Sequence, residues 1–194
     1  MKQSVTGVVL AGGQGRRMGS VDKGLQTLKN KPMIEWVLQR FSPQVNEVLI
    51  NANRNIDQYA RYGHRVITDE VKDFSGPLAG LHRGLVEAKY ELVATVPCDS
   101  PFLPNDLISR LRVLLEQQHA DIAVAKTGAQ VHPVFCLCKR SLESHLSKFL
   151  AEGGRKIDAW YSTLKLVEVD FDDETAFSNI NSLQELSQVE ASLR

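Results

Sequence analysis

The sequence predicts an α/β fold of three layers, with a mostly parallel sheet between two layers of helices. Short apolar runs typical of buried strands alternate with helix-like segments through residues 5–96. In the second half, apolar residues recur at helical spacing in residues 107–115, 142–150 and 183–193. Because such alternation favours parallel strands joined by helices, we expect a Rossmann-like arrangement.

Each element is expected where a short apolar run or an amphipathic stretch falls between polar or glycine-containing segments. The expected strands are residues 5–10, 47–50, 65–68, 92–96, 122–125, 133–138 and 164–169. The expected early helices are residues 33–41, 57–62 and 78–88, and the later helices carry the three apolar stripes named above. Ser182 and Glu185 form a capping box at the start of the last helix.

Composition excludes several classes of protein. The 194 residues suit one domain with a substantial core, and 23 basic residues balance 23 acidic ones. A nucleic-acid scaffold usually has a basic excess, so we expect no nucleic-acid partner. We expect no signal peptide at the start of the chain, and no apolar run reaches the roughly 18 residues of a membrane span. We therefore expect a cytoplasmic protein that does not bind membranes.

The three cysteines do not form the pattern of a disulfide framework, which fits a reducing cytosol. Cys136 and Cys138 stand two apart, with His132 just before them, so a metal site is one interpretation. No second pair with ligand spacing accompanies them. A strand whose alternate residues are small apolar thiols is the interpretation we favour.

A glycine-rich loop follows the first expected strand. Residues 8–19 read Val-Val-Leu-Ala-Gly-Gly-Gln-Gly-Arg-Arg-Met-Gly, and Asp22-Lys23 comes shortly after. Glycines let backbone N–H groups close around an anion, and Arg16, Arg17 and Lys23 add positive charge there. An ordinary surface turn is the alternative, but three nearby cations without an anion would repel one another. The loop therefore predicts binding of a polyphosphate, most simply a nucleoside triphosphate.

Two familiar phosphate loops do not match. A Walker A loop ends in Gly-Lys-Ser or Gly-Lys-Thr, whereas Lys23 lies between Asp22 and Gly24. The dinucleotide fingerprint needs a small residue where Met18 stands, and an acidic residue after the second strand, which here ends in residues 51–53, Asn-Ala-Asn. The loop is therefore of another kind.

Polar residues follow four of the expected strands. The first strand runs into residues 10–13, and Asn51, Asp69 and Asp99 follow the next three. Ligands of open α/β sheets bind outside the carboxyl ends of the strands. If these four strands lie side by side in parallel, all four sites face one crevice. This convergence predicts an active site from the residues alone.

Asp99 lies between Pro97 and Pro101, which restrict the direction of its carboxylate. Mg²⁺ prefers one or two carboxylates together with phosphate and water, so Asp99 is the expected metal ligand. A turn or helix-capping aspartate is the alternative. Lys23 is expected to contact phosphate oxygens, and Arg17 or Arg16 to hold the leaving pyrophosphate.

Asn51 and Asp69 suit recognition of a nucleoside. An amide can hydrogen-bond a base edge or a ribose, and a carboxylate can accept from the two N–H groups that guanine presents. A structural turn is the alternative for Asp69. In the loop of residues 74–80, Gly76 and Gly80 are expected to allow close approach of a base, with Leu78 packed on it. A simple helix-entry loop is the alternative, and it explains Pro77 but not the two glycines together.

These residues carry a resemblance to known enzymes. The Leu-Ala-Gly-Gly-x-Gly-x-Arg-Met-Gly motif followed by Asp-Lys resembles the nucleotidyltransferases that build nucleotide-sugars and related cofactors. The short gap from Gly19 to Lys23 and the motifs at residues 51–53, 76–80, 97–101 and 179–181 narrow it to the molybdenum cofactor guanylyltransferases. It extends from Thr6 to about Leu186 and implies a fold of the nucleotide-diphospho-sugar transferase type. The GTP contacts it implies are Leu10, Ala11, Gly12, Lys23, Asn51, Asp69 and Asp99, and Gly13 belongs to the same loop.

The resemblance also implies how the chain is divided. We expect a single domain, 1–194, with residues 1–105 binding the nucleotide and residues 106–194 binding the acceptor. Asn179 and Asn181 are placed near the pterin by the resemblance, although Asn181 is equally well a helix cap. Arg155, after two glycines, is expected to hold the phosphate of the acceptor.

The reaction implied is transfer of GMP from Mg-GTP to the terminal phosphate of molybdenum-molybdopterin, with release of pyrophosphate. A cytidylyl- or sugar-phosphate nucleotidyltransferase on the same fold is the alternative, and a non-catalytic cofactor carrier is another. The expected cofactor is Mg²⁺. The expected partners are GTP and molybdopterin, with other cofactor-biosynthesis proteins and recipient molybdoenzymes, and the expected state is a monomer. His82 and His132 receive no role, and each is expected to be a neutral packed histidine.

Overall fold

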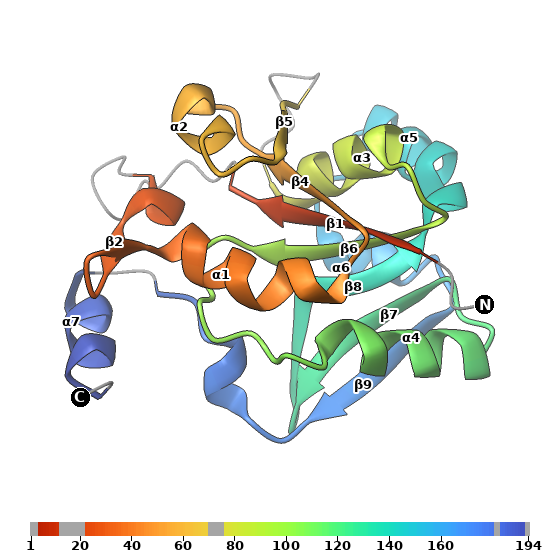
Figure 1. The fold of residues 1–194 in the computed structure, drawn as a ribbon. Coiled ribbons are helices and arrows are strands. Elements are labelled where there is room, and N and C mark those ends of the chain that lie inside the picture. The colour runs from red at the N-terminus through yellow and green to blue at the C-terminus, as the bar shows by residue number, and fades with distance from the viewer. Residues whose placement is uncertain (1–3, 12–21, 70–75, 181–182, 193–194) are drawn as a thin grey trace.

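A seven-stranded sheet lies at the centre of the computed structural model, which describes residues 4–11, 22–69, 76–180 and 183–192. The strand order is β5-β4-β1-β6-β8-β7-β9. β8 runs antiparallel to its neighbours and the other pairs are parallel, which confirms a mostly parallel sheet (Figure 1). The strands are β1 (Val5–Leu10), β4 (Glu47–Asn51), β5 (Arg65–Ile67), β6 (Leu92–Pro97), β7 (Ile122–Thr127), β8 (Gln130–Lys139) and β9 (Leu166–Phe171).

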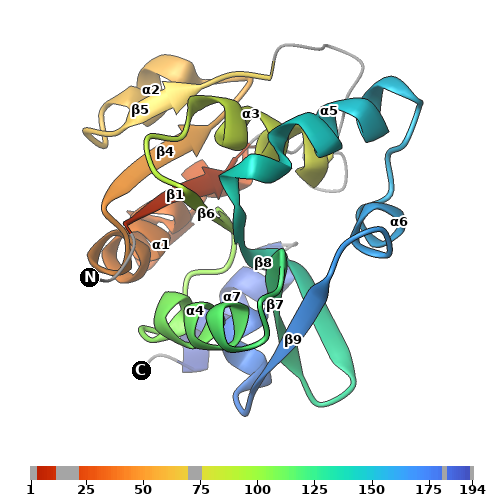
Figure 2. The ribbon, with the colours of Figure 1, turned by 90° about the vertical axis from the view of Figure 1, so that its right-hand side faces the viewer.

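Helices cover both faces of this sheet. α1 and α4 pack on one face, and α3 and α5 on the other, so the three-layer prediction is confirmed (Figure 2). The helices are α1 (Met33–Phe41), α2 (Ile56–Ala60), α3 (Pro77–Glu87), α4 (Leu107–Gln117), α5 (Glu143–Ala151), α6 (Ile157–Tyr161) and α7 (Leu183–Ser192). Short 3₁₀ helices are η2 (Lys23–Leu25), η3 (Ser42–Gln44), η4 (Arg140–Leu142) and η5 (Glu174–Phe177).

The two faces of β1 explain the layering. Successive side chains of a strand point to opposite faces, so Val9 joins the apolar cluster under α1 and α4. Val8 joins the cluster under α3 and α5. In α3, Gly84 lies so close to β1 that a Cβ there would be 2.7 Å from Cγ2 of Val8. This close approach lets α3 pack directly against the sheet.

Some elements differ from the expectation. Helix α6 and a hairpin of β2 (Thr27–Leu28) and β3 (Lys31–Pro32) were not predicted, and β9 begins two residues later than expected. Cys136 and Cys138 are buried in β8, which confirms the strand interpretation. The expected capping residue Ser182 lies outside the described residues.

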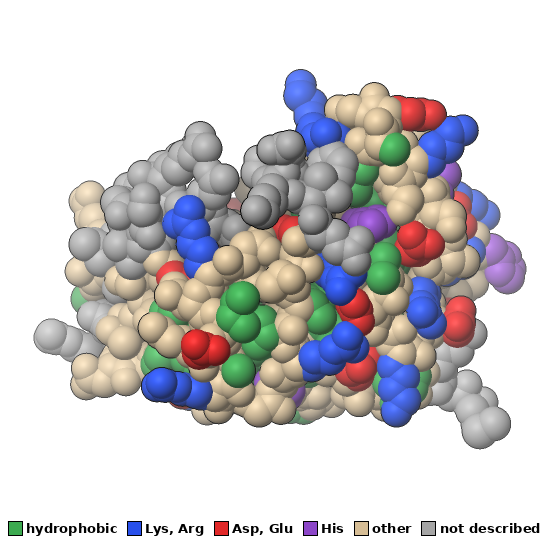
Figure 3. Space-filling view, turned by 90° about the horizontal axis from the view of Figure 1, so that it is seen from above, with side chains coloured by type: hydrophobic (Ala, Val, Ile, Leu, Met, Phe, Trp, Pro, Cys, Tyr) green, Lys and Arg blue, Asp and Glu red, His purple; other side chains and the backbone are tan. Residues whose placement is uncertain are grey.

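The helices in the described part are too short or too polar to cross a membrane. On the face seen in Figure 3, basic and acidic side chains are interspersed, in keeping with the balanced composition.

Candidate active site

The ends of four parallel strands meet at one edge of the sheet. Leu10 at the end of β1 pairs with Asn51 of β4 and with Pro97 of β6, and Asn51 pairs with Ile67 of β5. The pairing continues past the strands, since Ala11 N donates to the carbonyl of Asn51 over 2.8 Å. The arrowheads of β1 and β6 point to this edge in Figure 1. The loops that carry Lys23, Asn51, Asp69 and Asp99 therefore begin or end in one place, as the sequence predicted.

Lys23 and Asp99 form an ion pair at this edge. Nζ of Lys23 lies 3.1 Å from Oδ2 of Asp99, across 76 residues of sequence. The lysine side chain is 25% exposed and the aspartate side chain 10% exposed. The two groups therefore stand side by side at the mouth of the site, with the carboxylate the deeper of the two.

Burial raises the pKa of the Asp99 carboxyl above its usual range, and Lys23 opposes that shift only in part. A carboxylate held in this way is stabilised by a further cation. One carboxylate fits Mg²⁺, which takes its remaining ligands from phosphate and water. Within the described residues no group of three or more His, Cys, Asp and Glu forms an all-protein metal cage. Asp99 is thus a fitting donor for a metal that arrives with its phosphate ligand.

The segment before α7 is tied to the Asp99 loop. Ile180 N donates to the carbonyl oxygen of Asp99 over 2.9 Å. The hydroxyl of Ser100, which is fully buried, donates to Oδ1 of Asn179 over 2.6 Å. Asn179 therefore lies beside the metal-ligand candidate although 79 residues separate it from Ser100. Asn181, the other predicted acceptor residue, lies outside the described residues.

Asn51 and Asp69 form a second polar cluster, joined by Asn53. Nδ2 of Asn51 donates to one oxygen of Asp69 over 2.8 Å, and Nδ2 of Asn53 donates to the other over 2.7 Å. Asp69 N returns a hydrogen bond to Oδ1 of Asn53 over 2.9 Å. Sequence reasoning assigned no separate role to Asn53, because nothing in the Asn-Ala-Asn motif shows that its side chain folds onto Asp69. Each Asp69 oxygen keeps a further lone pair for a ligand.

Gly80 allows this cluster to form. A Cβ at Gly80 would lie 2.4 Å from Oδ1 of Asn51 and 2.7 Å from Cδ2 of Leu10. The glycine thus leaves room for a protein side chain, whereas the sequence suggested room for a base. Leu78 was expected to pack on that base, but it is 2% exposed and buried against the sheet. That expectation was wrong because the first turn of α3 points Leu78 into the core.

We expect Gly80→Ala to weaken nucleotide binding. The added methyl must displace Asn51 or Leu10, which costs about 1–3 kcal/mol of folding free energy and offsets the gain in helix propensity. Gly84→Ala is the matched control. Gly84 lies on the same helix as Gly80, but the added methyl would crowd Val8 of β1, away from the polar cluster. Thermal midpoints should fall for both variants, while titration with GTP should weaken for Gly80→Ala alone. Equal GTP affinities of the two variants would contradict this role.

The remaining predicted residues divide into two groups. Leu10 and Ala11 stand at the end of β1 as expected, whereas Gly12, Gly13, Arg16 and Arg17 lie outside the described residues. Arg155 is exposed between α5 and α6, and its guanidinium donates to the carbonyl of Leu150 over 2.8 Å at the end of α5. Arg155 is therefore a helix-capping residue as well as a candidate for the acceptor phosphate.

The two unassigned histidines are packed, as expected. His132 is hydrogen-bonded to Oγ1 of Thr127 at 2.7 Å and stacks on Phe177, and burial lowers its pKa. Nε2 of His82 lies 2.6 Å from Oγ of Ser147, which joins α3 to α5. These contacts account for both side chains without a catalytic role.

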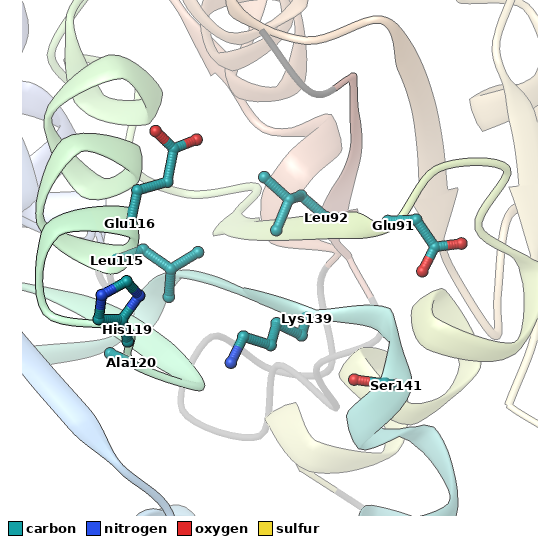
Figure 4. A pocket seen from close by; sticks show the side chains of 8 residues that line it. All are labelled: Glu91, Leu92, Leu115, Glu116, His119, Ala120, Lys139 and Ser141. Carbon is teal, nitrogen blue, oxygen red and sulfur yellow. The ribbon is translucent and has the colours of Figure 1, made fainter.

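A cavity of about 330 Å³ lies at the opposite edge of the sheet, between the start of β6 and the end of α4 (Figure 4). Its lining contains Leu92, the first residue of β6, whereas Asp99 follows the last. It lacks the strand-end loops that gather the polar side chains described above. Its lining residues are Glu91, Leu92, Leu115, Glu116, His119, Ala120, Lys139 and Ser141.

Known proteins are similar to this chain in sequence and in fold. Residues 7–166 match the MobA-like NTP transferase domain. The molybdenum cofactor guanylyltransferase of Ralstonia nicotianae is 50% identical, with 95% of each chain covered, and that of Cupriavidus metallidurans is 48% identical over 100% of this chain and 98% of its own.

Two solved structures extend the comparison. Molybdopterin-guanine dinucleotide biosynthesis protein A from Archaeoglobus fulgidus has a TM-score of 0.82 and 26% identity, covering 97% of this chain and 98% of its own. The 4-diphosphocytidyl-2C-methyl-D-erythritol synthase from Anaerococcus prevotii has a TM-score of 0.75 at 14% identity over 98% of each chain, so it shares the fold alone. With the family model matched over most of its length, the chain is a nucleotidyltransferase that belongs to the MobA-like NTP transferase domain family.

Proposed function

We propose that this enzyme transfers GMP from Mg-GTP to the terminal phosphate of molybdenum-molybdopterin. The products are the guanine dinucleotide form of the cofactor and pyrophosphate. The observation that carries the proposal is the Lys23–Asp99 pair at the strand-end edge, with the Asn51–Asp69 cluster on the neighbouring strand ends. The relatives at about 50% identity are molybdenum cofactor guanylyltransferases, and that activity supplies the two substrates.

The chemistry needs charge stabilisation more than acid–base catalysis. A phosphate oxygen of the acceptor forms a bond to the α-phosphorus of GTP, and the bond from that phosphorus to pyrophosphate breaks. Because the nucleophile is already an anion, no strong general base is required. Lys23 would stabilise negative charge on the triphosphate, and Asp99 would hold Mg²⁺. The metal supplies neutralisation of the phosphate oxygens when bound.

The Asn51–Asp69 cluster would bind the nucleoside. The two side-chain amides fix the Asp69 carboxylate in one orientation, and its remaining lone pairs can accept from the two N–H donors of guanine. In this proposal residues 1–105 hold the nucleotide and residues 106–194 hold the acceptor. Asn179, beside the Asp99 loop, and Arg155 are the described candidates for the acceptor side.

Asp69→Asn is expected to reduce GTP affinity by about 10- to 100-fold, because one carboxylate oxygen that accepts hydrogen bonds is replaced by an amide group that donates them. Its preference for GTP over CTP should fall by a similar factor. Asn53→Ala is the control: it removes one support of Asp69 but keeps the carboxylate, so a smaller loss with the preference intact is expected. Titration calorimetry with both nucleotides measures this. An unchanged GTP preference in Asp69→Asn would remove the residue from base recognition.

Pyrophosphate release tests the activity itself. The purified enzyme is mixed with Mg²⁺, molybdenum-molybdopterin and one nucleoside triphosphate, and pyrophosphate is followed with time. Release with GTP that depends on the acceptor supports the proposal. Release with CTP instead would move the substrate to the cytidylyl alternative, and GTP binding without release would favour a non-catalytic carrier.

A further inference from the structure

Tyr59 joins the core of the protein to the segment that carries Lys23. Its side chain is fully buried among apolar neighbours under α1, yet its hydroxyl donates a hydrogen bond to Oδ1 of Asp22. Burial is the main cause that raises the pKa of Tyr59 far above its usual range, so the hydroxyl stays protonated and keeps donating. Asp22 is the residue immediately before Lys23. A rigid core residue thus contacts the segment that presents the lysine.

A second donor completes the hold on Asp22. Nδ2 of Asn55 donates to Oδ2 of Asp22 over 2.9 Å, so each carboxylate oxygen accepts one side-chain hydrogen bond. Asn55 has a φ of +50°, a left-handed conformation that asparagine adopts more readily than most residues. Asn55 and Tyr59 both follow β4, the strand that ends in Asn51. The strand that contributes a nucleoside-site residue therefore continues into the segment that fixes Asp22.

The residue after Lys23 is fixed as well. A Cβ at Gly24 would lie 2.6 Å from the hydroxyl oxygen of Tyr59 and 3.2 Å from Cβ and Sγ of Cys98. Gly24 is therefore packed between Tyr59 and Cys98, which precedes Asp99. Lys23 is held on one side through Asp22 and on the other through Gly24. Its Nζ then spans the remaining distance to Asp99.

This arrangement matters because a lysine side chain has four rotatable bonds, and fixing its backbone lowers the entropy lost when it binds a phosphate. We propose that Tyr59 and Asn55 are positioning residues that hold Asp22, and through it set Lys23 in place for the triphosphate. The inference rests on the proposed nucleotide site. It predicts that replacing Tyr59 or Asn55 weakens binding of the triphosphate group and leaves binding of the nucleoside unchanged.

The test compares GTP with guanosine in Mg²⁺ buffer, by calorimetry on the full chain. Tyr59→Phe keeps the ring and removes the donor, and we expect GTP binding about tenfold weaker with guanosine binding unchanged. Combining Tyr59→Phe with Lys23→Ala should give no loss beyond that of Lys23→Ala, because the positioned group is gone. Tyr62→Phe is the matched control, because it removes a hydroxyl from a ring whose centroid lies 6.5 Å from that of Tyr59. We expect this variant to bind GTP like the wild type.

Asn55→Gly provides an independent variant, because glycine keeps the left-handed backbone and removes the amide. It should weaken GTP binding in the same way as Tyr59→Phe. If both variants bind GTP like the wild type while Lys23→Ala binds it weakly, the positioning role is wrong and the proposed function stands. If Lys23→Ala also binds GTP normally, both are wrong. Equal weakening of GTP and guanosine would reveal a structural role for Tyr59 and would overturn the inference.

Discussion

Asp99→Asn is expected to reduce nucleotidyl transfer by about 100- to 1,000-fold or more, while making the unliganded protein more stable. The loss follows because a neutral amide is a poor ligand for the Mg²⁺ that Asp99 would hold, and the metal would neutralise charge on the triphosphate. The gain follows because Asp99 is 7% exposed and its burial disfavours the charged form. An amide of the same shape keeps the packing without that cost. We therefore expect a higher thermal midpoint than that of the wild type near neutral pH in metal-free buffer.

The pH dependence of this gain is fixed by the direction of the pKa shift. The pKa of Asp99 is raised in the folded protein, so the folded state binds the proton more tightly than the unfolded chain does. Stability of the wild type relative to Asp99→Asn is therefore lost as the pH rises from the ordinary carboxyl pKa through the raised one. The advantage of the variant should be full above that window and should vanish below about pH 4.

Thermal unfolding of both proteins across this pH range, in the presence of a chelator, measures the effect. Asp106→Asn is the control, because that side chain is 59% exposed at the start of α4 and its ion pair with Arg110 is 3.8 Å long. It should change neither turnover nor the pH dependence. A wild type that is more stable than Asp99→Asn at pH 7 would contradict the account of the buried carboxylate, and normal turnover of the variant would remove Asp99 from the metal site.

Lys23→Ala is expected to lower kcat/KM for GTP by about 100-fold, because the charge that faces the triphosphate is lost. The loss should appear in GTP binding as well as in turnover, since the ground-state triphosphate already carries the charge that Lys23 contacts. Folding should be affected little, because removing Lys23 leaves Asp99 able to bind a proton.

Lys165→Ala serves as the matched control. It removes an exposed lysine just before β9, the last strand in the sheet order and far from the strand ends that form the site. Steady-state kinetics at several GTP concentrations separate kcat from KM for both variants. Equal kcat/KM in Lys23→Ala and Lys165→Ala would show that charge at position 23 contributes nothing to the reaction, and the assignment of the phosphate loop would be wrong.

Local patterns predicted most of the elements. The ranges expected for β1 and α1 agree with the structure because both rest on unbroken periodicity: β1 is an apolar run and α1 buries five residues along one face. Helix α6 was missed although it is as long as α2, which was expected at residues 57–62. The antiparallel direction of β8 was also not predicted, since strand pairing depends on contacts far apart in the sequence.

The candidate site was predicted to the same extent and for the same reason. Asn51, Asp69 and Asp99 end or follow strands, and parallel strands bring their ends together. Lys23 begins η2 and reaches the same place through its ion pair with Asp99. Tyr59 and Asn53 were not predicted, because their roles depend on which way a side chain turns after the strand has ended. Leu78 was misassigned on the same ground. Sequence patterns thus predicted that the site lies at the carboxyl ends of the strands. The contacts between neighbouring loops were seen only in the structure.

The most direct test of the proposed site is Mg²⁺-dependent binding of GTP, CTP, ATP and UTP to the purified protein, measured by titration calorimetry. The account predicts binding of GTP in preference to the other three, with affinity that falls when Mg²⁺ is removed or when Lys23 is replaced by alanine. Preference for a pyrimidine nucleotide would keep the fold and the phosphate site but contradict the role of Asp69. Failure to bind any of the four would contradict the nucleotide site at this edge of the sheet.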